Sequence, residues 1–125
     1  MADPPTPVGD PPVPESASLR AWLPQVVREL VASCDPVRII LFGSVARGEE
    51  GPESDLDLMV VFDHLEKGQR MEAKAKLMAA STAPVPCDIF VTDVAEFEAG
   101  RDVNGTMVYW PAHEGLVVHE RARSQ

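Results

Sequence analysis

The chain has few cysteines, few cations and no long apolar run, and each shortage excludes a class of protein. Its two cysteines, Cys34 and Cys87, lie far apart and form no CxxC or Cys/His cluster, so no zinc site is predicted. We expect free, buried thiols in a reducing cytoplasm, with a disulfide as the alternative. No apolar run approaches the roughly 18–20 residues that span a bilayer, and the N-terminus carries no export signal. We therefore expect a cytoplasmic protein that binds no membrane.

Positive charge is scarce as well. Eleven lysines and arginines face twenty aspartates and glutamates, which gives a formal net charge of -9. A polyanion would be repelled by most of such a surface, so stable binding of nucleic acid is not expected. A small nucleotide that arrives with magnesium is not excluded, because the cation inverts the local field. The acidic balance also suits a basic protein partner.

The length of 125 residues fits one compact domain and is too short for two. Residues 1–15 contain six prolines and almost nothing to bury, which predicts a disordered or extended arm. The arm is interpreted as a solubilising leader, with a proline-rich docking ligand as the alternative. Residues 16–125 are predicted to form the single domain.

Strands and helices alternate along this domain. Helical spacing predicts a helix from Ser16 or Ser18 to about residue 33, with Pro24 as a kink or as a first-turn residue. Further helices are predicted at 45–47, 66–80 and 104–112, and the helix at 66–80 has Met71, Ala75 and Met78 on one side. Another helix is predicted to begin after Asp93, which caps it, with Glu96 at the capping-box position. Strands are predicted at 37–42, 55–62, 85–92 and 116–119. This order predicts an α/β (α+β) fold in which a small mixed β-sheet packs with helices.

One motif carries most of the chemical information. Gly43 and Ser44 follow a predicted strand, and ten residues later the chain reads Asp55-Leu-Asp57. A glycine-serine turn at the start of a helix can offer N–H groups to an anion. Carboxylates at i and i+2 of a strand point to the same face and can hold hard divalent cations. The alternative is that Asp55 caps the strand and Asp57 is merely solvated.

Two further residues extend the motif. Asp88 interrupts an otherwise apolar strand, where it either completes a three-carboxylate metal site or faces water from a sheet edge. Arg47 either contacts nucleotide phosphates or is an exposed arginine at a helix end. The spacing of Gly43 and Gly48 also matches that of a P-loop, but the following Glu49 and its neighbour would repel phosphates, so a P-loop is rejected.

The segment GSVARGEEGPESDLDLMVVF, with CDIFVT after it, resembles the minimal nucleotidyltransferases of the DNA polymerase β superfamily. The resemblance is strong over residues 37–92 and implies a polymerase-β-like nucleotidyltransferase fold. It also implies two magnesium ions held by Asp55, Asp57 and Asp88, with Asp88 placed to help deprotonate the acceptor. Gly43, Ser44 and Arg47 would bind the phosphates of ATP, the nucleotide donor.

Short single-domain members of this superfamily resemble the antitoxins of HEPN–MNT toxin–antitoxin pairs, which transfer AMP from ATP to a tyrosine of a HEPN ribonuclease toxin. We therefore expect a protein adenylyltransferase with a HEPN-domain partner, as a homodimer or a hetero-oligomer with the toxin. The alternatives are transfer to a small hydroxylated molecule such as an aminoglycoside, or an antitoxin that acts by binding alone. Tyr109 and Trp110 are expected to pack in the core, with contact to an adenine or to a partner as the alternative.

Overall fold

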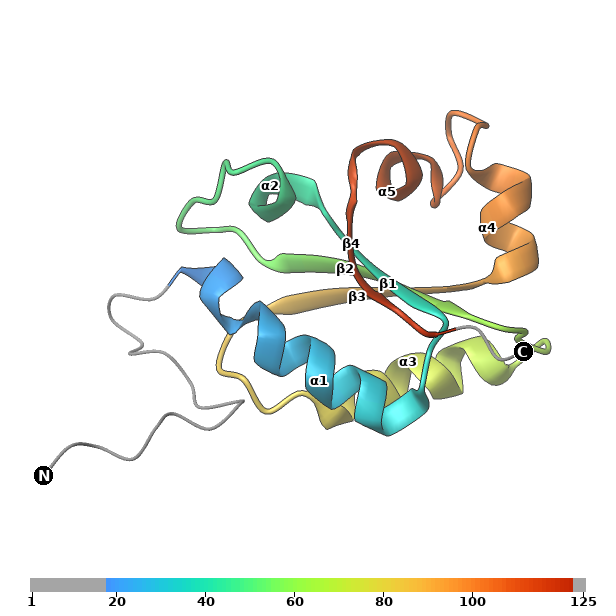
Figure 1. The fold of residues 1–125 in the computed structure, drawn as a ribbon, viewed down its shortest axis with the longest axis horizontal. Helices are drawn as coiled ribbons and strands as arrows, with labels where there is room; N and C mark the ends of the chain where they lie inside the picture. Colours follow the sequence, from blue (N-terminus) through green and yellow to red (C-terminus); the bar gives the residue numbers. More distant parts are fainter. Residues whose placement is uncertain (1–17, 123–125) are drawn as a thin grey trace, which may run out of the picture.

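The computed structural model describes residues 18–122, and the arm predicted at residues 1–15 lies outside this range. Four strands form one mixed sheet in the order β3-β2-β1-β4 (Figure 1). β1 (Arg38–Phe42) pairs antiparallel with β2 (Leu56–Phe62) on one side and with β4 (Leu116–Glu120) on the other. β2 pairs in parallel with β3 (Cys87–Asp93), and the connection between them contains the crossover helix α3 (Gln69–Ala80). The predicted small mixed sheet packed with helices is therefore confirmed.

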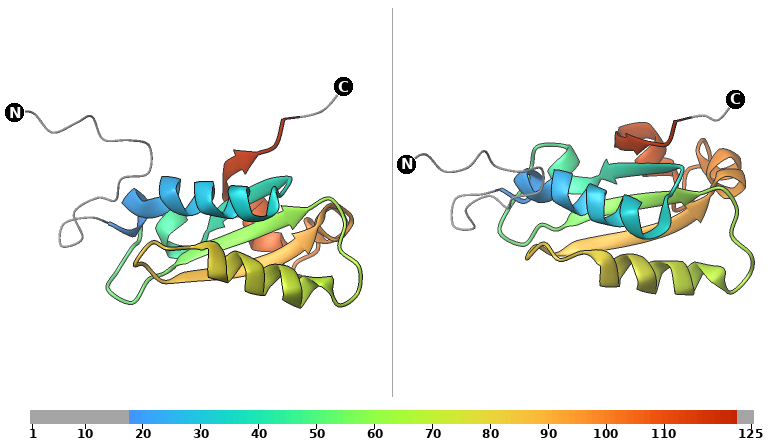
Figure 2. Two further views of the ribbon diagram at one scale, coloured as in Figure 1. Left: turned by 90° about the horizontal axis from the view of Figure 1, so that it is seen from below. Right: turned by 60° about the horizontal axis from the view of Figure 1, so that its bottom comes forward.

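Helices α1 (Leu23–Cys34) and α3 cover one face of the sheet (Figures 1 and 2). The main core lies between them and the sheet, because the side chains of alternate strand residues point to this face. Its members from the first two strands are Ile39, Leu41, Leu56, Leu58 and Val60. The helix side supplies Leu23, Val26, Leu30 and Leu77.

The other face is covered over only part of its length. Helices α4 (Val94–Gly100) and α5 (Tyr109–Glu114) lie over it, and a smaller core of Ile40, Met59, Val61, Phe97 and Val108 fills the space beneath. Along β2, the residues that reach this face change from Asp57 to Met59 and Val61. The acidic end of β2 therefore lies beyond this smaller core, where the chain that follows β1 packs against Asp57.

The start of the domain follows its sequence signals closely. Ser18 provides a cap, since its hydroxyl accepts a hydrogen bond from the N–H of Ala21 at 3.2 Å at the start of the 3-10 helix η1 (Leu19–Trp22), whereas Ser16 lies outside the described residues. Pro24 lies in the first turn of α1, where a missing N–H costs nothing, so it restarts the helix and does not kink it. Asp35 ends α1 in a left-handed conformation, with its N–H bonded to the carbonyl of Val31.

The predicted order of strands and helices is confirmed, but several bounds are different, and the predicted apolar side of one helix is exposed. The helix after β1, α2 (Gly43–Ala46), begins two residues earlier than predicted, and α3 begins three residues later, after Gly68. Met71, Ala75 and Met78 lie on one side of α3 as predicted, but all three are exposed, and the buried residue of the helix is Leu77. The helix packs on the sheet through small side chains around Leu77, so the large methionines gave a misleading apolar pattern.

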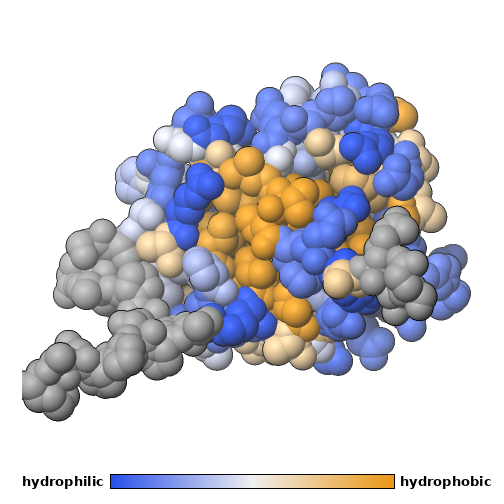
Figure 3. Space-filling view, in the orientation of Figure 1, coloured by the Kyte–Doolittle hydropathy of each residue, from blue (hydrophilic) through white to orange (hydrophobic). Residues whose placement is uncertain are grey.

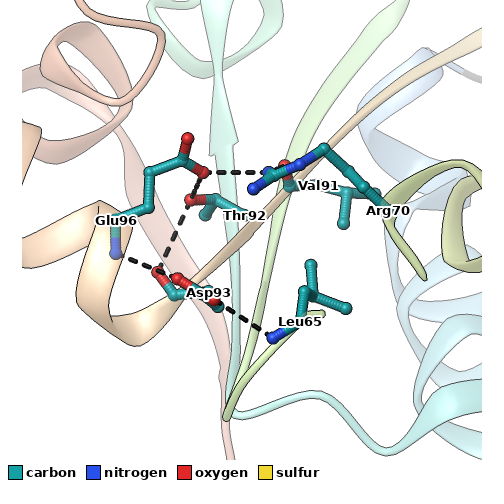
Figure 4. A network of polar contacts seen from close by, with 6 residues as sticks. All are labelled: Leu65, Arg70, Val91, Thr92, Asp93 and Glu96. Atoms are coloured by element: carbon teal, nitrogen blue, oxygen red, sulfur yellow. Dashed lines mark hydrogen bonds and ion pairs between the residues drawn. The ribbon is translucent and has the colours of Figure 1, made fainter. Parts of the chain in front are cut away.

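A polar network closes the C-terminal end of β3 (Figure 4). The Asp93 carboxylate accepts hydrogen bonds from the N–H of Glu96 at 2.9 Å and from the N–H of Leu65 at 3.1 Å. The Glu96 carboxylate binds Arg70 at 2.9 Å and the hydroxyl of Thr92. Asp93 therefore caps α4 as predicted, while the side chain of Glu96 pairs with Arg70 instead of closing a capping box.

An apolar surface lies where β4 forms the edge of the sheet beside α1 (Figure 3). Leu116 and Val117 on β4 are exposed. A shallow apolar groove next to them is lined by Leu23, Pro24, Val27, Val31 and Val118. Cys34 and Cys87 are both free, as expected, but both are only half-buried, so the expectation of buried thiols is not met. Among residues 18–122, no helix has the length and apolar character needed to cross a bilayer.

Candidate active site

Three carboxylates meet at the end of the sheet where β2 and β3 begin. Asp57 is the second residue of β2, and its register partner in the neighbouring parallel strand is Asp88, so both side chains point to the same face. Asp55 comes just before β2, two residues from Asp57 and on the same side. One carboxylate oxygen from each of the three residues lies within 4.8 Å of the other two.

The cluster is electrostatically unbalanced. Partial burial and the nearby charges of Asp55 and Asp88 raise the pKa of Asp57 to about 6, and Arg47 opposes this shift only weakly. Among residues 18–122, no lysine, arginine or histidine forms an ion pair with any of the three carboxylates. A set of three mutually repelling carboxylates fits a hard divalent cation, for which carboxylate oxygens are the preferred protein ligands. Asp88 is exposed on the edge strand β3 and is also a member of the three-carboxylate cluster. Its position therefore fits both interpretations, a metal ligand and an edge residue that faces water.

The backbone at Gly43, directly after β1, packs closely against the side chain of Asp57 because glycine has no Cβ. Its φ angle is +82°, in the left-handed region that favours glycine. A Cβ atom at this position would lie 3.0 Å from Cγ of Asp57 and 3.3 Å from its Cβ, closer than carbon atoms pack. The glycine of the motif thus sets the distance between the turn and the metal-binding carboxylate.

Ser44 is tied to the loop that leads to the aspartates. Its hydroxyl lies 3.0 Å from the hydroxyl of Ser54, and the Ser54 hydroxyl also accepts a hydrogen bond from the N–H of Gly51 at 2.9 Å. The carbonyl of Ser44 accepts the N–H of Glu49 at 2.8 Å. These bonds fold residues 49–54 back onto α2 and bring Ser44 to the same end of the sheet as the carboxylates.

Arg47 ends α2 and is half exposed. Its guanidinium binds Glu49 at 3.0 Å and lies 3.9 Å from Glu114 of α5. It lines an open cleft of about 490 Å³ together with Phe42, Gly43, Trp110 and Glu114. Arg47, the predicted phosphate ligand, therefore lines the same cleft as Gly43, and none of the three carboxylates lines this cleft. Its guanidinium already pairs with two acidic side chains.

Sequence reasoning missed several residues at this site. The expectation that Trp110 packs in the core is wrong, because its side chain is 52% exposed and lines the cleft. Phe42 and Glu114 were not considered, nor was Ser54. Only Ser54 had a usable signal, since it directly precedes the first aspartate of the motif. Phe42 and Glu114 had no such signal in the sequence, because they meet only where α5 packs over β1.

Comparisons with known proteins found one matching family and one similar fold. The family model described as "Nucleotidyltransferase domain" matches residues 20–103. The fold is also similar to a crystal structure from Sulfolobus solfataricus, provisionally described as a nucleotidyltransferase, with a TM-score of 0.55 and 19% sequence identity. That match covers 78% of this chain and 76% of the other. No curated protein sequence matches the chain. The family match ends before α5, so Trp110 and Glu114 lie outside it.

Proposed function

The chain belongs to the nucleotidyltransferase domain family, and from this premise we propose that it transfers AMP from ATP to a tyrosine hydroxyl of a partner protein, a HEPN-domain ribonuclease toxin. The observation that carries the proposal is the convergence of Asp55, Asp57 and Asp88 beside the turn at Gly43. A divalent-ion site next to such a turn is suited to phosphoryl or nucleotidyl transfer.

The residues of the site would share the work in the following way. Asp55, Asp57 and Asp88 would hold magnesium, which when bound supplies positive charge to the phosphate oxygens. The turn at Gly43 and Ser44 would bind the phosphates of the triphosphate beside the carboxylates, and Arg47 would contact its outer oxygens. The acceptor hydroxyl loses its proton to a carboxylate, with Asp88 the most exposed of the three. A bond then forms between its oxygen and the α-phosphorus, while the bond to the bridging oxygen breaks and pyrophosphate leaves.

A protein acceptor is supported by two features of the surface. The site is open on the exposed edge of the sheet, where a tyrosine of another chain can reach Asp88. The apolar surface of β4 and α1 is of the kind that soluble proteins cover with another chain. The net charge of -9 also suits a basic partner, such as a ribonuclease with an RNA-binding surface.

The test uses ATP labelled at the α-phosphate, Mg²⁺ and a HEPN-domain protein encoded beside this one. We expect label on the partner, no label without Mg²⁺, and at least a 100-fold loss in Asp57→Asn. Asp102→Asn is the matched control, because Asp102 is an exposed carboxylate whose one ion pair among residues 18–122 is with His113, at 3.1 Å. Its labelling should equal that of the unmodified protein.

Each alternative gives a different result in this assay. Label on a small hydroxylated acceptor, with none on any partner, would identify a small-molecule nucleotidyltransferase. Full neutralisation of the toxin by Asp57→Asn would identify an antitoxin that acts by contact alone. Either result would overturn the proposal of protein adenylylation.

A further inference from the structure

The cleft between α2 and α5 has the composition of a ligand site, although the carboxylates do not line it. Two of its walls are aromatic, formed by Phe42 at the end of β1 and Trp110 on α5. One cation, Arg47, and one anion, Glu114, complete the lining near Gly43. Apolar walls with a few convergent polar groups are typical of sites for small organic molecules.

Trp110 is the unusual member of this cleft. Its side chain is 52% exposed, whereas the only other tryptophan, Trp22, is 4% exposed in the core. Tyr109 packs edge-on against the indole at 5.0 Å between ring centroids and stacks on His113 at 4.4 Å. The indole is thus supported by an aromatic neighbour while half of its surface stays free to contact a ligand.

The cleft begins where the carboxylate cluster ends. Phe42 is the register partner of Asp57 across β1 and β2, so the two side chains point to the same face of the sheet. Gly43 lines the cleft and is also the residue packed against Asp57. A nucleotide whose phosphates lie at Asp57 and Gly43 would therefore have its remaining parts within reach of the cleft.

We propose that Trp110 is the stacking platform for the base of the donor nucleotide, an inference that rests on the proposed function and identifies where the base is held. Flat π-surfaces bind any nucleobase through its face. The Glu114 carboxylate only accepts hydrogen bonds, so it favours a base with an exocyclic amino group, such as adenine, over uracil, whose edge is rich in carbonyl oxygens. The Glu114 carboxylate lies at the cleft wall, 3.9 Å from Arg47.

The test compares ATP with tripolyphosphate, which has the same phosphates and no base, both in the presence of Mg²⁺. ATP should quench tryptophan emission of the unmodified protein saturably, and tripolyphosphate should not. Trp110→Phe, which retains only the buried Trp22, should show no such change. Trp110→Ala should weaken ATP binding about tenfold and leave tripolyphosphate binding unaltered, and Trp110→Phe should restore most of the affinity.

A matched control comes from Met107→Ala, since Met107 is a comparably exposed apolar residue that lines a different hollow. It should bind both ligands normally. Equal affinity of ATP and tripolyphosphate, or ATP binding that is unchanged in Trp110→Ala, would overturn the base platform and leave the transferase proposal intact. If neither ligand binds, both proposals fail.

Discussion

Replacing Gly43 with alanine should disable the site while the fold survives. The new methyl group would lie 3.0 Å from Cγ of Asp57, whereas carbon atoms pack at about 3.5–4.0 Å. Oδ2 of Asp57 would lie closer still, so the carboxylate must retreat by about 1 Å or more. The left-handed backbone at φ +82° adds a separate cost of about 1–2 kcal/mol for any residue with a Cβ.

These two costs can be separated within the same chain. Gly48 has a similar φ of +76°, but a Cβ atom there would meet nothing within 4 Å. Gly48→Ala should thus lose the same stability as Gly43→Ala through the backbone, without displacing a carboxylate. Since a misplacement of about 1 Å in a reacting group can lower turnover about 100-fold, only Gly43→Ala should lose activity on that scale.

Metal binding gives a measurement that needs no acceptor. Mn²⁺ can be titrated into each variant and the free ion followed by electron paramagnetic resonance. We expect weakened Mn²⁺ binding in Gly43→Ala and unchanged binding in Gly48→Ala, with similar losses of thermal stability in both. Equal Mn²⁺ affinity and equal label transfer in the two variants would show that the turn does not position Asp57, and the reasoning would be refuted.

Three further predictions follow from the same structure. The pKa of Asp57 is about 6 in the folded state and 3.8 in the unfolded chain, so the folded state holds the proton more tightly. The free energy of unfolding of the metal-free protein should therefore fall by about 1–2 kcal/mol, after allowance for solvent screening, as the pH rises from about 4 to about 6. Thermal unfolding across this range should show the slope, Asp57→Asn should abolish it, and Mg²⁺ should raise Tm more at about pH 7.5 than at about pH 5. Asp93→Ala should lower the free energy of unfolding by about 1 kcal/mol in a urea titration, with Mn²⁺ affinity unaffected. Leu77→Ala should cost about 2–5 kcal/mol and Met71→Ala less than about 0.5 kcal/mol, and the reverse ranking would contradict the observed face of α3.

The sequence contained the local part of this site. Asp55 and Asp57 share a face because side chains alternate along any strand, and Gly43 marks a turn because only glycine takes a left-handed φ without strain. Asp88 is included because a buried carboxylate in an apolar strand needs a partner, yet Asp88 is exposed, so this prediction rests on a burial that the structure does not show. The register that places it beside Asp57 depends on how β3 joins the sheet, and only the structure shows it.

The parts that could not be predicted all depend on packing between distant segments. Met71 and Leu77 are both apolar residues of one helix, and the choice of the buried one follows from the small side chains that let α3 approach the sheet. Trp110 and its neighbour Tyr109 look like core residues in the sequence. The short α5 lies across the end of β1, and this position leaves the indole in the cleft.

The two ends of the paired strands β2 and β3 show why the acidic cluster is better explained by a ligand than by the fold. At the C-terminal end, hydrogen bonds from the N–H groups of Glu96 and Leu65 hold the pKa of Asp93 below its usual value. The charge of Asp93 therefore stabilises the protein above the usual pKa, and this stabilisation is lost as the pH falls through the lowered pKa of the folded state. At the other end, Asp57 is partly buried between two like charges and its pKa is raised, so its ionisation destabilises the metal-free protein near neutral pH. A bound cation would offset the unfavourable ionisation of Asp57. Removing the charge by Asp57→Asn should therefore make the metal-free protein more stable and abolish metal binding. A loss of stability in that variant would mean that Asp57 serves the fold, and the argument for a metal site would lose its electrostatic basis.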